Sequence, residues 1–232
     1  MRLRAADLRG GRGLAALFLS VATGIPSLQL GGRAQAMVGG APPAPREFGR
    51  SVVMILGSSG TACTATERHP QFDIKRLFNH LATADVALIK LAQPLPARIS
   101  PAPIAGGSET VAVGDSLVVA GYGVTLRGDG RTGGTARATT LVVTGQPGPL
   151  QVRLFDPVSK GLSAGLGACA GDSGAPAFRP SSAGPAILGV VSWSTGPNLT
   201  AGCGGLTGVT PLARYRGWIV DTARRLGTPL TP

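Results

Sequence analysis

The sequence predicts an all-β fold that ends in one α-helix. It contains 36 glycines and 19 prolines among 232 residues, which suits many short strands joined by turns better than long helices. Short segments rich in β-branched residues recur between turn residues, at the spacing of a barrel or sandwich. Near the end, residues 215–226 place Trp218, Ile219 and Ala223 at helical spacing, and two arginines suit the helix C-terminus.

The strands are expected where apolar or alternating runs are bounded by glycine, proline or polar turn residues. The first three runs precede a proline-rich stretch, and the remaining five lie in the second half of the chain. Eight segments meet this description: residues 51–56, 61–66, 85–91, 116–122, 139–144, 151–155, 175–178 and 187–193.

The composition excludes several classes of protein. Hydrophobic residues at 43% are enough for a sizeable core, and only 14% of residues are charged, so we do not expect intrinsic disorder. No uninterrupted apolar run reaches the length of an ordinary membrane span. The net charge is +11, but the arginines are scattered singly and no basic cluster is interleaved with aromatic residues. We therefore expect no nucleic-acid partner, and a basic nucleic-acid-binding protein remains the weakest alternative.

Residues 1–36 have the three-part layout of a secretory signal peptide. Four arginines precede residue 13, an apolar run covers residues 14–21, and Ala34-Gln35-Ala36 offers small residues to signal peptidase. Cleavage after Ala36 would make Met37 the first residue of a secreted or periplasmic protein, with no membrane span left in it. Export also implies an oxidising compartment in which a disulfide persists. The alternative is an uncleaved N-terminal helix.

The most informative segment is CAGDSGAP, from Cys169 to Pro176. Small neighbours leave the hydroxyl of Ser173 uncrowded and its adjacent N–H groups freely placed, as a nucleophile beside an oxyanion hole requires. The alternative interpretation is a tight turn. The hydrolase elbow G-x-S-x-G is not met, because its fifth position is Ala175.

With four further segments in the same order, the chain resembles the secreted trypsin-like serine proteases of the chymotrypsin fold. These segments are MVGG at residues 37–40, DVALIKL at 85–91, VSWS at 191–194, and GCG at 202–204 followed by GVT at 208–210. The resemblance implies two antiparallel β-barrels, one at about residues 37–105 and one at about 106–213, and a helix at about 214–226. It also implies cleavage of peptide bonds in protein or peptide substrates.

The resemblance assigns roles to single positions. Ser173 would be the nucleophile, Asp85 would orient the general base, and the N–H groups of Gly171 and Ser173 would hold the oxyanion. Asp172 would be buried, and the family pairs such a carboxylate with a free α-amino group, here that of Met37. Signal cleavage would therefore itself complete the site.

The substrate pocket follows from the same resemblance. Cys169 and Cys203 would form a disulfide across it, and the residues lining it would be Gly167, Ser192, Trp193 and Ser194. Gly167 stands where members that cleave after Arg or Lys carry an acid. Without that charge, we expect a preference for small or medium apolar side chains.

The chain departs from the family at the base histidine. The family has Ala-Ala-His-Cys between the first cysteine strand and the aspartate strand, but here TACTAT at 61–66 runs directly into residue 67. The base histidine and the usual partner of Cys63 are both absent, so we expect an incomplete N-terminal barrel. His69 matches a surface strand of the family. His80, five residues before Asp85, would border the groove, and we expect neither to replace the base.

These observations predict a serine endopeptidase impaired by loss of its base. The alternative is a non-catalytic homologue that binds proteins through the same groove, and omission of a coding segment would also explain the gap. Two separated histidines and three cysteines have no recognised metal-ligand spacing, so we expect no metal, and no organic cofactor is implied. The sequence leaves the oligomeric state open.

Overall fold

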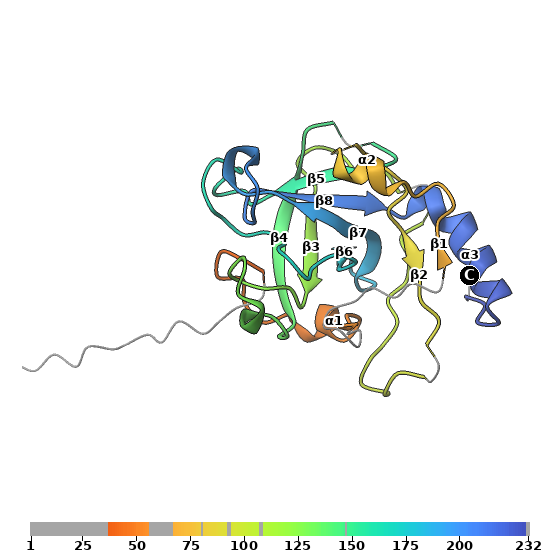
Figure 1. Ribbon diagram of the computed structural model, residues 1–232. Helices are drawn as coiled ribbons and strands as arrows, with labels where there is room; N and C mark the ends of the chain where they lie inside the picture. The colour runs from red at the N-terminus through yellow and green to blue at the C-terminus, as the bar shows by residue number, and fades with distance from the viewer. Residues whose placement is uncertain are drawn as a thin grey trace, which may run out of the picture. The chain divides into compact units, whose positions relative to one another are not determined.

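Six antiparallel strands close into a barrel in the second half of the chain (Figure 1). The computed structural model describes residues 37–55, 67–79, 81–91, 94–106, 109–146 and 148–230. Around the barrel the strands follow the order β3–β4–β5–β8–β7–β6. Their bounds are β3 Ser116–Gly121, β4 Arg137–Thr144, β5 Val152–Phe155, β6 Pro176–Arg179, β7 Ala186–Ser194 and β8 Leu206–Pro211.

The barrel closes because its strands carry apolar residues that point into one shared core. Leu117, Leu141, Leu154 and Val209 come from four different strands, and each has 0% of its surface exposed. Burying such side chains is the main force that stabilises a barrel of this size. The barrel strands therefore supply most of this core, and Met37, Ala41 and Ala105 of the preceding region complete it.

The region before the barrel has little regular structure among the described residues. It contains helix α1 (Arg46–Gly49), strand β1 (Glu67–Arg68), helix α2 (Ile74–Phe78) and strand β2 (Ala87–Leu88), and β1 pairs with β2. Asp73 caps α2 by accepting hydrogen bonds from the N–H groups of Lys75 and Arg76. Phe48 of α1 packs on Phe178 of the barrel, with ring centroids 5.3 Å apart.

The C-terminal helix α3 (Arg216–Arg225) ends the fold beside β1 and β2 (Figure 1). The 3-10 turn Ala213–Tyr215 leads into it, and two further 3-10 turns lie at Gly130–Thr132 and Pro197–Leu199. Ile219 of α3 is buried in a cluster that also contains Tyr215, Val86 and Ala84. No helix in the described part of the chain is long and apolar enough to cross a membrane.

The structure confirms the predicted fold class, a mostly β protein with a closed barrel and a C-terminal helix, and it corrects several elements. The strand expected at 51–56 is wrong, because residues 51–55 form no ladder with any described residue. The strand expected at 85–91 shortens to β2. Strand β8 and helix α2 were not predicted from the sequence. The strand at 61–66 and the signal peptide at 1–36 lie outside the described residues.

Strand β8 escaped prediction because Gly208 and Pro211 resemble turn residues. In the structure β8 pairs with β5 on one side and β7 on the other, so ladder hydrogen bonds on both edges hold it. The indole of Trp193 lies over Gly208, where a methyl group would overlap the ring. Tertiary packing thus favours a glycine inside this strand.

Candidate active site

Ser173 lies in an exposed turn that leads into β6. Gly171 has φ +90°, a conformation that favours glycine, and Asp172 is fully buried while Ser173 and Gly174 face solvent. Two hydrogen bonds hold the turn: Gly174 N donates to Val191 O at 2.8 Å, and Ala175 N donates to Asp172 O at 2.9 Å. The backbone that carries the Ser173 hydroxyl is therefore held in an exposed turn, and it is not in a helix.

Two backbone N–H groups beside this hydroxyl have no acceptor. Among the described residues, neither Gly171 N nor Ser173 N donates a hydrogen bond. Both residues are exposed, so water satisfies these donors in the absence of a substrate. Unpaired N–H groups flanking a presented hydroxyl are the feature that an oxyanion hole needs.

The carboxylate of Asp172 points into the protein. It accepts hydrogen bonds from Gly123 N at 2.8 Å and from Cys169 N at 2.9 Å. Burial raises the pKa of Asp172 to about 6, and the two hydrogen bonds counteract part of this rise. A side chain at Gly121 or Gly123 would overlap the carboxylate. Sequence reasoning missed these two glycines, which lie in the GYG segment where β3 ends.

Met37 is also buried, and its neighbour Val38 forms a β-bridge with Gly167. Met37 shares the barrel core with Ala168 and Ala175, which lie on either side of the Asp172 turn. In the chain that still carries residues 1–36, the nitrogen of Met37 is a peptide amide and not an amine. The predicted ion pair with Asp172 requires cleavage and stays a prediction.

Asp85 and Ser192 meet although 107 positions separate them in the sequence. Ser192 Oγ donates a hydrogen bond to Asp85 Oδ2 at 2.5 Å. Asp85 is half-buried; burial raises its pKa, and the hydrogen bond from Ser192 acts in the opposite direction. Ser192 follows Val191, whose carbonyl holds the Ser173 turn. The structure therefore connects the Ser173 turn to Asp85 through two consecutive residues of β7.

His69, one of the two histidines of the sequence, packs against aromatic side chains near the C-terminus. Its ring packs edge-on against Tyr215 and Trp218, with centroids 4.9 Å away in both cases. Its Nδ1 accepts a hydrogen bond from Gln71 N at 3.1 Å, and burial followed by the charge of Arg214 lowers its pKa. His80 and Cys63 lie outside the described residues.

Of the residues predicted to line the substrate pocket, Ser192, Trp193 and Ser194 lie at the end of β7, and Gly167 lies beside the disulfide between Cys169 and Cys203. Gly167 is buried, and a methyl group there would make ordinary contacts with Gly204 and Thr207. Position 167 therefore offers no carboxylate to pair with a basic substrate side chain. Ser194 Oγ donates a weak hydrogen bond to Gly202 O at 3.3 Å.

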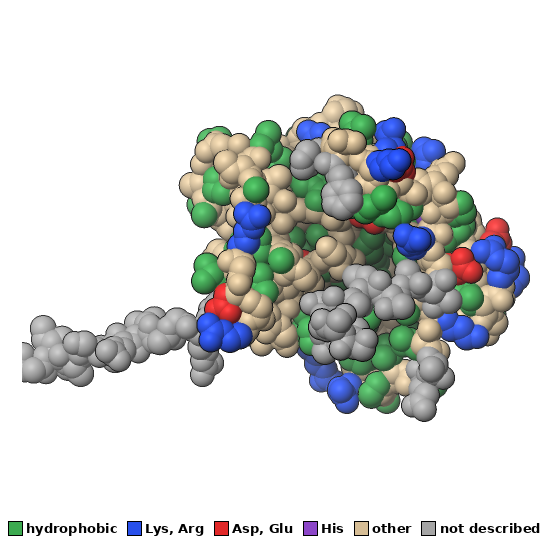
Figure 2. Space-filling model, in the orientation of Figure 1, with side chains coloured by type: hydrophobic (Ala, Val, Ile, Leu, Met, Phe, Trp, Pro, Cys, Tyr) green, Lys and Arg blue, Asp and Glu red, His purple; other side chains and the backbone are tan. Residues whose placement is uncertain are grey.

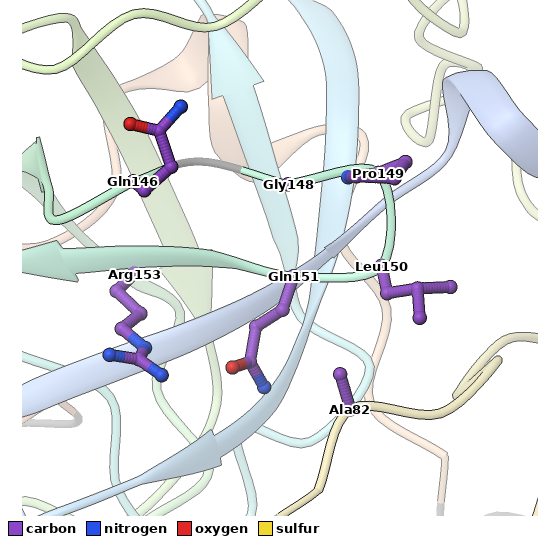
Figure 3. A pocket seen from close by; sticks show the side chains of 7 residues that line it. All are labelled: Ala82, Gln146, Gly148, Pro149, Leu150, Gln151 and Arg153. Atoms are coloured by element: carbon purple, nitrogen blue, oxygen red, sulfur yellow. The ribbon is translucent and has the colours of Figure 1, made fainter.

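A cavity of about 360 Å³, not foreseen from the sequence, lies beside the Asp85 segment (Figure 3). Ala82 contributes one side, and the hairpin between β4 and β5 contributes the rest. Figure 3 shows the side chain of Gln151 pointing toward Ala82, with Leu150 at the edge. The lining residues are Ala82, Gln146, Gly148, Pro149, Leu150, Gln151 and Arg153.

Comparisons with known proteins agree with this architecture. The family model described as Trypsin matches residues 38–219. A solved structure of a mutant human heparin binding protein (CAP37) shares 20% identity over 84% of this chain and 100% of that chain, with a TM-score of 0.58. A second mutant of the same human protein shares 26% identity, but only 60% of this chain and 56% of that chain are covered, with a TM-score of 0.46. The search of curated proteins found no match.

Proposed function

This chain belongs to the trypsin family of serine proteases, and from that premise we propose that it is an exported serine endopeptidase acting through Ser173. Ser173 Oγ would attack the carbonyl carbon of a peptide bond and form an ester, while the hydroxyl proton passes to the leaving amine. Water would then hydrolyse the ester and restore the hydroxyl. The observation that carries the proposal is the exposed Ser173 turn, which β7 connects to Asp85.

The backbone around Ser173 supports the first of these steps. The free N–H groups of Gly171 and Ser173 would donate to the oxygen that becomes negative as the tetrahedral intermediate forms. Donors that are fixed in advance stabilise this charge without rearrangement, and each is worth roughly 3 kcal/mol in the transition state. This contribution does not depend on a histidine.

Proton transfer is the step in which we expect this chain to be weak. Asp85 would orient a base and stabilise its charged form, but His69 is packed against Tyr215 and Trp218. His80 is the one remaining histidine in the sequence. Loss of a triad member lowers turnover on the order of 10⁴- to 10⁶-fold. We therefore infer an impaired protease.

The packing of His69 also favours a second candidate function. A homologue without a base would bind protein or peptide partners along the groove beside Ser192 and Ser194 without cleaving them. The same N–H groups and pocket wall would then hold a peptide backbone.

A fluorophosphonate probe separates the two functions, because it reacts only with an activated serine. Peptide mass mapping should place the label on Ser173, and Ser173→Ala should abolish it while Ser181→Ala, at an exposed turn, leaves it unchanged. His80→Ala should abolish labelling if His80 supplies the base, and His69→Ala should retain it. Absence of labelling in the secreted, folded protein would exclude the protease and support the binding homologue.

The pocket supports a preference for small or medium apolar side chains before the scissile bond. Gly167 offers no charge partner, and the Trp193 indole covers Gly208 on the adjacent strand β8. Profiling with peptides that differ only at this residue should favour Ala or Val over Arg by at least tenfold. Stronger cleavage after Arg would overturn this assignment.

Processing forms the last part of the proposal. We infer that cleavage after Ala36 frees the amine of Met37 and that this amine pairs with the buried carboxylate of Asp172. The burial of both residues supports it. N-terminal sequencing of secreted protein should begin at Met37, and any other start would remove this step.

A further inference from the structure

Two neighbouring loops expose three large apolar side chains on one side of the barrel. Val158 and Leu162 belong to the loop at 157–164 and have 89% and 70% of their surface exposed, and Leu199 in the loop at 197–200 has 71%. Asn198 joins the loops, because its N–H donates to Gly161 O at 2.8 Å and its Nδ2 donates to Leu162 O at 3.2 Å. We call Val158, Leu162 and Leu199 the apolar platform.

The first loop is anchored from beneath by Asp156. This carboxylate is buried and accepts hydrogen bonds from the N–H groups of Val158, Ser159 and Leu166 at 3.2 to 3.3 Å. Lys160 N also donates to Asp156 O at 2.8 Å. Buried hydrogen bonds of this kind hold a loop in one conformation, so the platform is presented ready-formed.

The backbone of both loops is strained where the platform is built. Lys160, Asn198 and Leu199 have φ values of 51°, 52° and 61°, in the left-handed region that favours glycine. A leucine in this conformation with its side chain in water gains nothing from packing. Strained residues that persist without a packing gain point to a role outside the fold itself.

The exposed charges beside the platform are basic, and the carboxylate of Asp156 beneath the first loop is buried. The two loops, PVSKGLSA and PNLT, contain one lysine and no acidic residue. Arg127 lies against the second loop, because its Nη1 donates to Ala201 O at 2.9 Å. Figure 2 shows hydrophobic and basic side chains on the lobe at the upper left, where Figure 1 places these loops.

We propose that the apolar platform docks this protein onto an anionic lipid surface. Val158, Leu162 and Leu199 enter the headgroup layer, and Lys160 and Arg127 lie against its negative charge. Apolar side chains combined with neighbouring basic residues are the arrangement by which proteins attach to a membrane surface without crossing it. This goes beyond the proposed protease activity, since it needs neither Ser173 nor a base.

The test is cosedimentation of the full chain with vesicles of phosphatidylcholine alone and of phosphatidylcholine with 30% phosphatidylglycerol. We expect binding to the anionic vesicles that weakens with salt. The triple variant Val158→Ser, Leu162→Ser, Leu199→Ser should bind at least tenfold more weakly. Lys160→Gln should bind about fivefold more weakly, and its binding should depend less on salt.

A matched triple variant replaces other exposed apolar residues, Val113, Leu91 and Leu95, with serine and should bind like the parent. Thermal unfolding of all variants checks that each is folded. Equal binding by both triple variants overturns the proposal, as does equal binding to neutral and anionic vesicles. Failure of the parent to bind, together with a dimer in sedimentation velocity that the platform variant abolishes, would show that the platform contacts a second copy of the chain.

Discussion

The closed barrel and the region that precedes it differ in how completely they bury their own apolar residues. Each barrel strand has a partner on both sides, and the core between them is fully buried. In the described residues 37–106 the strands are two residues long, and Val53, Met54 and Leu95 are 40 to 43% exposed. The barrel therefore supplies most of the contacts around the Ser173 turn, with Met37 packed beneath it, whereas the preceding region depends on contacts with the barrel and α3.

The candidate active site is divided between these two regions. Ser173 and Ser192 belong to the barrel. Asp85 belongs to the dependent region, where its hydrogen bond to Ser192 and the burial of Ala84 and Val86 against the C-terminal segment hold it. We infer that the nucleophile survives damage to the N-terminal region and that the position of Asp85 does not. The following predictions test this difference.

The largest effect is expected in the barrel core. Leu154→Ala removes a side chain with 0% exposure and should lower the free energy of unfolding by about 3 to 4 kcal/mol. Leu95→Ala, in the dependent region, should change it by less than about 0.5 kcal/mol because Leu95 is 43% exposed. Urea unfolding measures both, and equal losses would contradict the proposed difference between the regions.

Removal of the disulfide comes next. Replacing Cys169 and Cys203 together with alanine should cost about 3 kcal/mol, because their bond closes a loop across a sequence separation of 34. Cys63→Ala serves as the control and should leave the free energy of unfolding unchanged. A Cys63 variant that loses as much stability as the double variant would show that the barrel disulfide is not the stabilising one.

A pH effect of similar size is expected from Asp172 in the uncleaved chain. Its raised pKa of about 6 means that the folded protein keeps a proton that the unfolded chain releases near pH 4. Stability should therefore fall by about 3 kcal/mol as the pH rises from about 4 to about 6, and then level off.

Asp172→Asn should remove that fall, because an amide does not titrate in this range. Its single oxygen can replace only one of the two carboxylate oxygens that accept from Gly123 N and Cys169 N, so the variant should also be less stable at every pH. Protein that begins at Met37 should also lose the fall, since an amine beside the carboxylate favours the charged form. Guanidinium titrations at several pH values measure the effect. An unchanged profile in Asp172→Asn would assign the pH dependence to another group.

The smallest effect is expected at the contact between the two regions. Ser192→Ala should cost about 1 to 2 kcal/mol, because it leaves the half-buried carboxylate of Asp85 without its donor. The pKa of Asp85 should rise further, which a carboxyl NMR titration would report. Ser194→Ala is the matched control, because it loses only a 3.3 Å hydrogen bond to Gly202 O. It should change neither the free energy of unfolding nor the pKa of Asp85 appreciably.

The elements that sequence reasoning located well are those whose local pattern and tertiary environment agree. The runs at β3 and β4 are apolar and β-branched, and each found partners on both sides. The run at 51–56 has the same local character, but its described part has no neighbouring strand to pair with. Strand propensity reflects how well a segment packs against neighbouring strands. It therefore predicts a strand wrongly where no neighbouring strand is present.

By itself, the sequence determined the family and five of the six barrel strands, and it singled out Ser173 and Asp85 as candidates, because these follow from local composition and the order of motifs. Only the tertiary structure decided that Ser192 meets Asp85, that Gly121 and Gly123 make room for Asp172, and that His69 is packed against Tyr215 and Trp218. Such contacts join segments far apart in the chain, and they depend on strand register and side-chain packing, which no local pattern specifies.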